Sequence, residues 1–198
     1  YNKLSFPYND EVLLNNVITN NGDNKHYNTK IKEVFLRRSD IKYIDTNIKI
    51  ENNVIYSMKR NSKLIIDVPS DAKGKILFVS FNLSNSQSCS IGDMAISING
   101  NINKKTCNEW KYYNGNDSFT YVISDKDLNS VTVEFLKGEY HIDNLRLYYI
   151  SYDDIKDINK NITKVNIDKI DGDNIYTSVN NIEDGYFVTS LPYDKGYT

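Results

Sequence analysis

Long apolar runs are missing from this sequence. None approaches the roughly 20 residues that a helix needs to cross a bilayer, and no signal-peptide pattern is present. An excess of positive charge is also missing, because 24 Lys and Arg face 26 Asp and Glu, for a net charge of -2. This balance argues against nucleic acid as a partner, since phosphate binding needs a basic surface. With only 9 Gly and 3 Pro in 198 residues, the chain is not a low-complexity linker.

Tyrosine and asparagine are abundant. The 16 Tyr, together with frequent Ile, suit half-buried pleated strands, whereas Asn suits turns and loop tips. Short strand-like runs bounded by turn residues recur about eight times from residue 41 onward, without intervening helices. They include 48–56 around an Asn-Asn turn, 63–68, 75–83, 94–103 around an Asn-Gly turn, 118–123, 130–136 and 141–150. The pattern predicts a mainly β protein built on a jelly-roll-like β-sandwich.

Shorter segments flank the predicted sandwich on both sides. We expect an N-terminal mixed segment (1–40), the sandwich (41–152), a linker helix (153–163) and a small β subdomain (164–198). A short helix near Asp10 is predicted in the first segment, because the apolar residues from Leu13 to Ile18 fall on one helical face. The linker is predicted as a helix because Ile155, Ile158 and Ile162 form one stripe.

The end of the sequence looks like half of a hairpin. Residues 186–191 predict a strand, and Pro192 and residues 194–196 predict a turn before the first residues of a return strand. A hairpin with one arm missing leaves unpaired backbone groups, which folded proteins usually avoid. We therefore expect a fragment that is truncated at its C-terminus.

Two stretches carry a resemblance to a known family. They are Leu145-Arg-Leu-Tyr-Tyr-Ile-Ser-Tyr-Asp-Asp-Ile155, at the end of the predicted sandwich, and Gly185-Tyr-Phe-Val-Thr-Ser-Leu-Pro-Tyr-Asp-Lys-Gly-Tyr-Thr198. In this order they resemble the extracytoplasmic C-terminal region of the YfhO family of bacterial multi-pass membrane proteins. The family motif typically has Trp where this chain has Tyr197, and it continues into a further strand. The resemblance covers residues 47–198 well and the first forty residues only in position.

The resemblance implies one piece of a membrane glycosyltransferase that uses a lipid-linked sugar to decorate cell-envelope polymers, such as the lipoteichoic acid of a Gram-positive bacterium. The piece would lie on the extracellular face of the cell membrane, joined to it through flanking segments. Its partner would be a cell-envelope glycan or a lipid-linked sugar. In such enzymes the catalytic acid lies in a loop of the membrane part, so no catalytic residue is carried over to this chain.

Cys89 and Cys107 are the only cysteines. Their Cys-x17-Cys spacing matches no zinc motif. Because they flank the predicted hairpin at 94–103, they can pair as a structural disulfide, as is common in extracellular domains. Two unpaired thiols, one on each strand, are the alternative.

One segment is typical of a binding loop. Trp110, Tyr112 and Tyr113 stand close to Asn116 and Asp117. Aromatic rings stack on the apolar face of a sugar while amides and carboxylates hold its hydroxyl groups, so this segment is our candidate carbohydrate-binding site. The simpler alternative is that Trp110 and one tyrosine pack against the rim of the sandwich.

No other residues form a pattern that is typical of a catalytic or metal site. His26 and His141 are far apart in sequence, and we expect His141 to be structural. Asp153 and Asp154 suit helix capping, and no acid pair is nominated for the two-carboxylate chemistry of glycosidases. We therefore expect no metal, no cofactor and a non-catalytic domain. The alternatives are a free-standing carbohydrate-binding module, a structural or partner-binding domain and, least favoured, a glycosidase.

Overall fold

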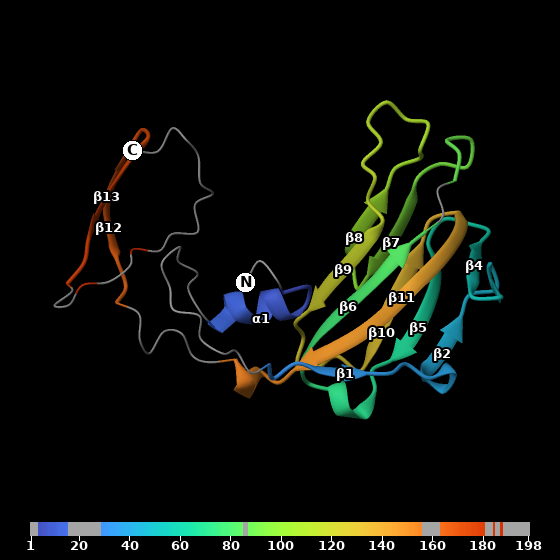
Figure 1. Cartoon of the computed structure of the whole chain (residues 1–198), viewed down its shortest axis with the longest axis horizontal. Helices are drawn as coiled ribbons and strands as arrows, with labels where there is room; N and C mark the ends of the chain where they lie inside the picture. The colour runs from blue at the N-terminus through green and yellow to red at the C-terminus, as the bar shows by residue number, and fades with distance from the viewer. Residues whose placement is uncertain are drawn as a thin grey trace.

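The computed structural model describes residues 4–15, 29–84, 87–155 and 163–180, together with Asp184 and Phe187. Two antiparallel sheets form its main body (Figure 1). One sheet has the order β3-β4-β11-β6-β9, with β1 also paired to β11. Its strands are β1 (Lys32–Val34), β3 (Ile48–Glu51), β4 (Val54–Ser57), β6 (Ile76–Leu83), β9 (Ser118–Ile123) and β11 (Gly138–Ile150). The other has the order β2-β5-β10-β7-β8, made of β2 (Ile41–Ile44), β5 (Ser62–Asp67), β7 (Met94–Ile98), β8 (Asn101–Lys105) and β10 (Ser130–Phe135).

The predicted jelly-roll-like sandwich is confirmed. Between β4 and β11 the chain changes sheet at every connection except the β7–β8 hairpin, which is the jelly-roll pattern. Asn52 and Asn53 turn between β3 and β4, and Asn99 and Gly100 turn between β7 and β8. All four have positive φ, from 47° to 84°, as two-residue hairpin turns require.

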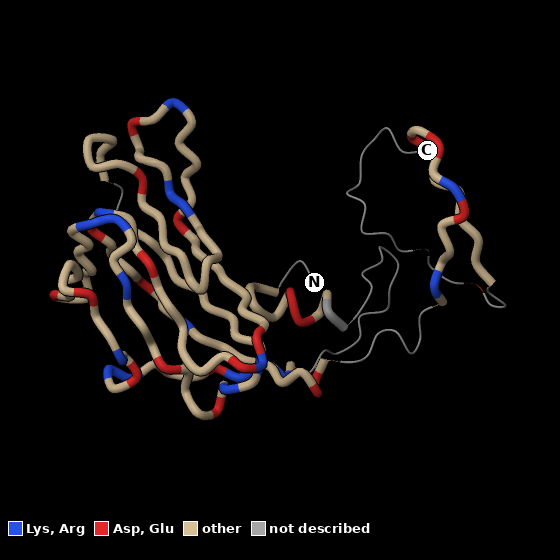
Figure 2. Tube along the Cα trace, turned by 180° about the vertical axis from the view of Figure 1, so that it is seen from behind, with Lys and Arg blue, Asp and Glu red and all other residues tan. Residues whose placement is uncertain are grey.

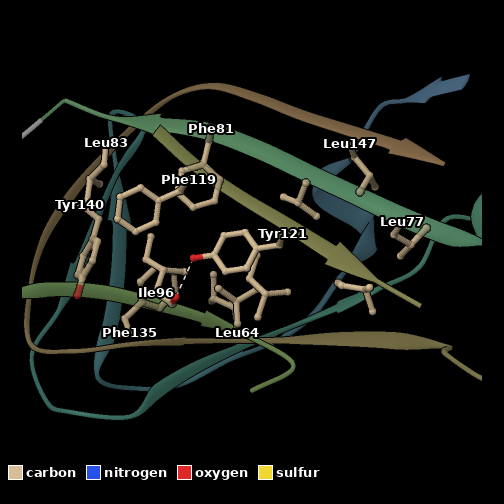
Figure 3. Close-up of a cluster of buried hydrophobic side chains, with 14 of the residues drawn as sticks. Leu64, Leu77, Phe81, Leu83, Ile96, Phe119, Tyr121, Phe135, Tyr140 and Leu147 are labelled. Carbon is tan, nitrogen blue, oxygen red and sulfur yellow. Dashed lines mark hydrogen bonds between the residues drawn. The ribbon is translucent and has the colours of Figure 1, made fainter. Parts of the chain in front are cut away.

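The main core lies between the two sheets (Figure 3). Phe81 of β6 stacks on Phe119 and Tyr121 of β9, with ring centroids 5.4 and 6.0 Å apart. The Tyr121 hydroxyl donates a 2.7 Å hydrogen bond to the carbonyl of Ile96, which links β9 of one sheet to β7 of the other. Burial raises the pKa of Tyr121, so its neutral hydroxyl is the stable form in this position.

A second, smaller core covers the outer face of the six-stranded sheet. Here Phe6 meets Phe78 of β6 and Tyr8 meets Tyr148 of β11, with centroids 5.9 and 6.0 Å apart. Tyr8 begins the helix α1 (Tyr8–Asn15), where the sequence predicted a helix near Asp10. β6 is therefore buried on both faces, which accounts for its nearly continuous apolar sequence.

The segment before residue 41 contributes a strand to the sandwich. β1 pairs with the far end of β11, from Lys32 opposite Tyr149 to Val34 opposite Leu147. Two short 3-10 helices, η1 (Arg38–Asp40) and η2 (Ser70–Ala72), lie in the connections that follow β1 and β5.

After β11 the chain stays against the sandwich for a few residues, because Tyr152 and Ile155 pack against the second core. A 3-10 turn, η3 (Tyr152–Asp154), lies where the linker helix was predicted to begin, and residues 156–162 of the predicted helix lie outside the described residues. The predicted strand pair of the C-terminal unit is present as β12 (Asn166–Asp171) and β13 (Asn174–Ser178), which pair only with each other among the described strands. The predicted terminal strand and turn lie outside the described residues, apart from Phe187.

Charges of both signs are distributed along the described parts of the trace (Figure 2). Some of them are paired across strands, such as Lys63 of β5 with Glu134 of β10 at 2.9 Å. The surface of the sandwich is therefore a mixture of opposite charges.

Candidate functional site

The predicted binding loop joins β8 to β9, and a covalent bond holds its base. The structure joins Cys89 to Cys107 in a disulfide, with the Cα atoms 5.0 Å apart. Cys107 lies two residues after β8, and Cys89 lies in the connection between β6 and β7. The disulfide therefore ties the start of the loop to a neighbouring connection at the same end of the sandwich (Figure 1).

Asn114 organises the loop from within. Its Oδ1 accepts hydrogen bonds from the backbone N–H groups of Thr106 and Asn116, both at 3.2 Å, and its Nδ2 donates to the carbonyl of Lys104 at 2.9 Å. The backbone N–H of Asn114 donates in turn to Thr106 Oγ1 at 2.9 Å. One amide side chain thus closes the two ends of the loop onto each other.

Asp93 supports the same base from the β7 side. One carboxylate oxygen accepts from the backbone N–H of Cys107 at 3.1 Å, and the other lies 2.5 Å from Lys104 Nζ. The hydrogen bond from Lys104, with a smaller contribution from the Cys107 N–H, holds the pKa of Asp93 below its usual range. The carboxylate is therefore charged at neutral pH and fixes the loop beside the disulfide.

The three aromatic residues form the outer part of this loop. Trp110, Tyr112 and Tyr113 are 48%, 66% and 41% exposed. The rings of Trp110 and Tyr112 are 5.7 Å apart at 84°, so they meet as a corner rather than as one flat surface. The Nζ atom of Lys111 lies 5.6 Å from the centre of the Tyr112 ring. A large part of each aromatic side chain is therefore available to a ligand.

Asn116 and Asp117 lie at the base of the loop. Asn116 Nδ2 donates to the carbonyl of Lys104 at 3.3 Å. Asp117 forms an ion pair with Lys105, whose side chain is only 3% exposed and also donates to the carbonyl of Leu83 at 3.4 Å. Of the five predicted site residues, the structure therefore places three on the exposed part of the loop and gives the other two contacts that hold its base.

The remaining polar residues considered from the sequence form local contacts. His141 Nε2 lies 2.6 Å from Glu139 Oε1, and Asp171 pairs with Lys169 at 2.6 Å. His26 lies outside the described residues. Within the described ranges, no three His, Cys, Asp or Glu side chains are grouped so that they could hold a metal ion.

Sequence reasoning missed two residues that shape the site, Asn114 and Asp93. Asn114 precedes Gly115, which has φ 57°, and an Asn-Gly pair is a turn signal that could have marked this position. No comparable signal marks Asp93, because its partner Cys107 is 14 residues away.

These features define an antiparallel β-sandwich domain with an aromatic loop anchored at one end. The sequence model of the family described as "Bacterial membrane protein YfhO" matches residues 2–198, and the chain belongs to this family, as the terminal motifs predicted. In the described part of the chain, no helix is both long and apolar enough to cross a membrane.

No curated protein matches the chain. Among solved structures, the C-terminal CBM6 of LamC, a marine laminarinase from Zobellia galactanivorans, is similar over 60% of this chain and 98% of its own, at 6% identity and a TM-score of 0.38.

Proposed function

We propose that this chain is a non-catalytic, extracytoplasmic domain of a YfhO-family membrane protein, and that its aromatic loop contacts a cell-envelope glycan. The observation that carries the proposal is the exposure of Trp110, Tyr112 and Tyr113 on a loop fixed by a disulfide. Exposed aromatic rings on a rigid base bind with little loss of conformational entropy, because the backbone is already ordered. A sugar ring offers the apolar C–H face that such a corner accommodates.

The disulfide supports the extracytoplasmic location. Disulfides persist in oxidising compartments and are rare in the cytoplasm of most bacteria. The Cys89–Cys107 bond is part of the framework of the loop and joins two connections of the sandwich. By the family resemblance, the ligand of the loop would be the acceptor polymer, such as lipoteichoic acid, or the lipid-linked sugar of a membrane glycosyltransferase.

Titration with glycans tests the role of the loop. We expect fragments of lipoteichoic acid to shift the NMR signals of the loop, and Tyr112→Ala to weaken binding about tenfold, a loss of roughly 1.4 kcal/mol. Tyr43→Ala is the matched control, because Tyr43 is also exposed but lies on β2, at the opposite edge of its sheet from β8. Equal affinity of both variants would assign glycan binding to another surface. Absence of saturable binding to any envelope glycan would favour the alternative, a structural or partner-binding domain.

Cysteine labelling tests the location. Lys73 is exposed in the turn after η2, and Lys73→Cys in the membrane protein adds a thiol on this domain outside the disulfide. A membrane-impermeant maleimide is expected to label this thiol in intact protoplasts. Labelling that occurs only after lysis would place the domain on the cytoplasmic side.

A further inference from the structure

We propose that the sandwich has a second binding site, an apolar cavity between its sheets that takes the end of one alkyl chain of an amphiphile. The cavity has a volume of about 120 Å³. Leu64 and Val133 line it from one sheet, and Leu77 and Leu147 from the other; Figure 3 shows three of these four. Asp67, the one charged side chain in this lining, is paired with Lys42 at 3.6 Å.

The cavity lies beneath an interruption in the six-stranded sheet. One edge of β11 pairs first with β4, through residues 138–141, and then with β1, through residues 147–149. The opposite edge pairs with β6. Among the strands that the structure describes, none pairs with β11 on the β4 and β1 side between these two stretches. The sheet therefore has a window of about five residues between the ends of β4 and β1.

The residues around this window also line the cavity. Ile55 belongs to β4, Leu36 follows β1, and Leu145 lies in the β11 bulge, where the pairing register shifts between Asp143 and Arg146. Leu145 is 51% exposed although it lines the cavity. The cavity therefore reaches solvent beside Leu145, and a ligand could enter there without unpairing a strand.

A second hollow, also of about 120 Å³, lies on the outer side of the window. It shares Leu36, Leu145 and Leu147 with the cavity and adds exposed Phe35. Glu33 and Arg146 form an ion pair in its lining at 3.2 Å. An apolar interior that continues into a mixed polar and apolar entrance matches an amphiphile with its chain inside and its head outside. Because the nearby charges are paired, the entrance favours a polar head group but selects neither a positive nor a negative one.

The size of the cavity limits how much of a chain it can hold. A dry apolar cavity of about 150 Å³ binds benzene, so 120 Å³ provides room for about four or five carbon atoms. Water is a poor occupant, since it needs two to four polar partners. The site uses none of the loop residues, so it does not depend on the proposed glycan contact. A membrane protein of the YfhO family also has amphiphiles as neighbours.

A series of 1-alkanols from ethanol to octanol tests the proposal on the whole 198-residue chain. Isoleucine methyl NMR reports the site directly, because Ile66, Ile96 and Ile142 line the cavity, whereas Ile102 and Ile167 are exposed outside it. We expect saturable shifts at the cavity methyls, and affinity that rises about fourfold per added methylene and levels off near hexanol. Affinity that continues to rise through octanol, or shifts only at Ile102 and Ile167, would overturn the proposal, because it would indicate general surface binding.

Two pairs of variants locate the site. Val133→Ile fills part of the cavity and is expected to weaken hexanol binding about fourfold, whereas Val122→Ile, the same change on an outward-facing position of β9, leaves it unchanged. Leu145→Glu places a charge at the entrance and is expected to weaken binding at least fivefold. Leu13→Glu is its control, because Leu13 is 48% exposed on α1. If Val133→Ile does not fold, the Leu145 and Leu13 pair decides; equal affinity within that pair contradicts the proposal.

Discussion

The disulfide at the base of the aromatic loop makes a quantitative prediction. Replacing both Cys89 and Cys107 by serine removes the bond without leaving a free thiol. The bond joins residues separated by 18 positions, and closing a loop of this length is worth about 3 kcal/mol in the chain-entropy relation. A domain of this size loses roughly 2–4 °C in melting temperature per kcal/mol. We therefore expect the double variant to melt about 6–12 °C lower than the wild type.

Loss of the disulfide should change the conformation of the aromatic loop much less than it changes the stability of the whole domain. Asn114 and Asp93 hold the loop by hydrogen bonds that do not involve the sulfur atoms. Trp110 is the only tryptophan and lies three residues after Cys107, so its fluorescence reports on the loop alone. In the folded variant we expect nearly unchanged Trp110 emission, while circular dichroism reports a urea midpoint shifted to lower concentration.

The assay compares urea unfolding of the wild type, the double variant and the wild type under reducing conditions. Reduction of the wild type should reproduce the loss, and a reductant should have no effect on the double variant. A loss of less than about 1 kcal/mol would refute the reasoning, because it would show that the unfolded chain gains little freedom from opening the loop. A large change in native Trp110 emission would show that the disulfide, rather than Asn114 and Asp93, determines the loop.

Two further predictions concern buried polar groups. Burial raises the pKa of Tyr140 to about 12, and its hydroxyl donates hydrogen bonds to the carbonyls of Ala95 and Leu136 at 3.1 and 3.0 Å. The folded pKa lies above the unfolded value of about 10. The contribution of Tyr140 to the free energy of unfolding is therefore intact below pH 10 and falls by about 1.4 kcal/mol per pH unit up to pH 12. Tyr140→Phe should remove this decrease of the free energy of unfolding with pH, measured by urea unfolding between pH 10 and pH 12. The same decrease in the variant and the wild type would contradict the prediction. Asp117→Asn leaves buried Lys105 without its ion pair, so it should lower the stability of the domain by about 2 kcal/mol more than Lys105→Met does. A lower melting temperature for Lys105→Met than for Asp117→Asn would show that the ion pair contributes little.

The local features of the fold could be predicted from the sequence. The Asn52-Asn53 and Asn99-Gly100 turns followed directly from residues that tolerate positive φ, and the strands beside them from alternating apolar positions. The aromatic loop was a candidate because Trp110 and two tyrosines stand close to Asn116 and Asp117, but the sequence left open whether these rings pack against the rim of the sandwich.

The features that depend on distant pairings could not be predicted. Nothing in Lys32–Val34 indicates that this strand pairs with residues 147–149, more than a hundred positions later. The window in the sheet depends on where β4 ends and β1 begins along β11, and therefore no single segment encodes it. Asp93 and Cys107 are likewise brought together only when β7 and β8 have paired.

The position of β11 in the sheet affects when the domain can form during synthesis. β11 pairs with β1, β4 and β6, yet it is the last strand of the sandwich to leave the ribosome. Translation proceeds at about 5–20 residues per second, so β6 waits roughly 3–13 s for its central partner. Throughout this interval β4 and β6 have unpaired edges that other chains can join. A nascent chain that stops before Gly138 therefore lacks the strand that joins β1, β4 and β6 into one sheet.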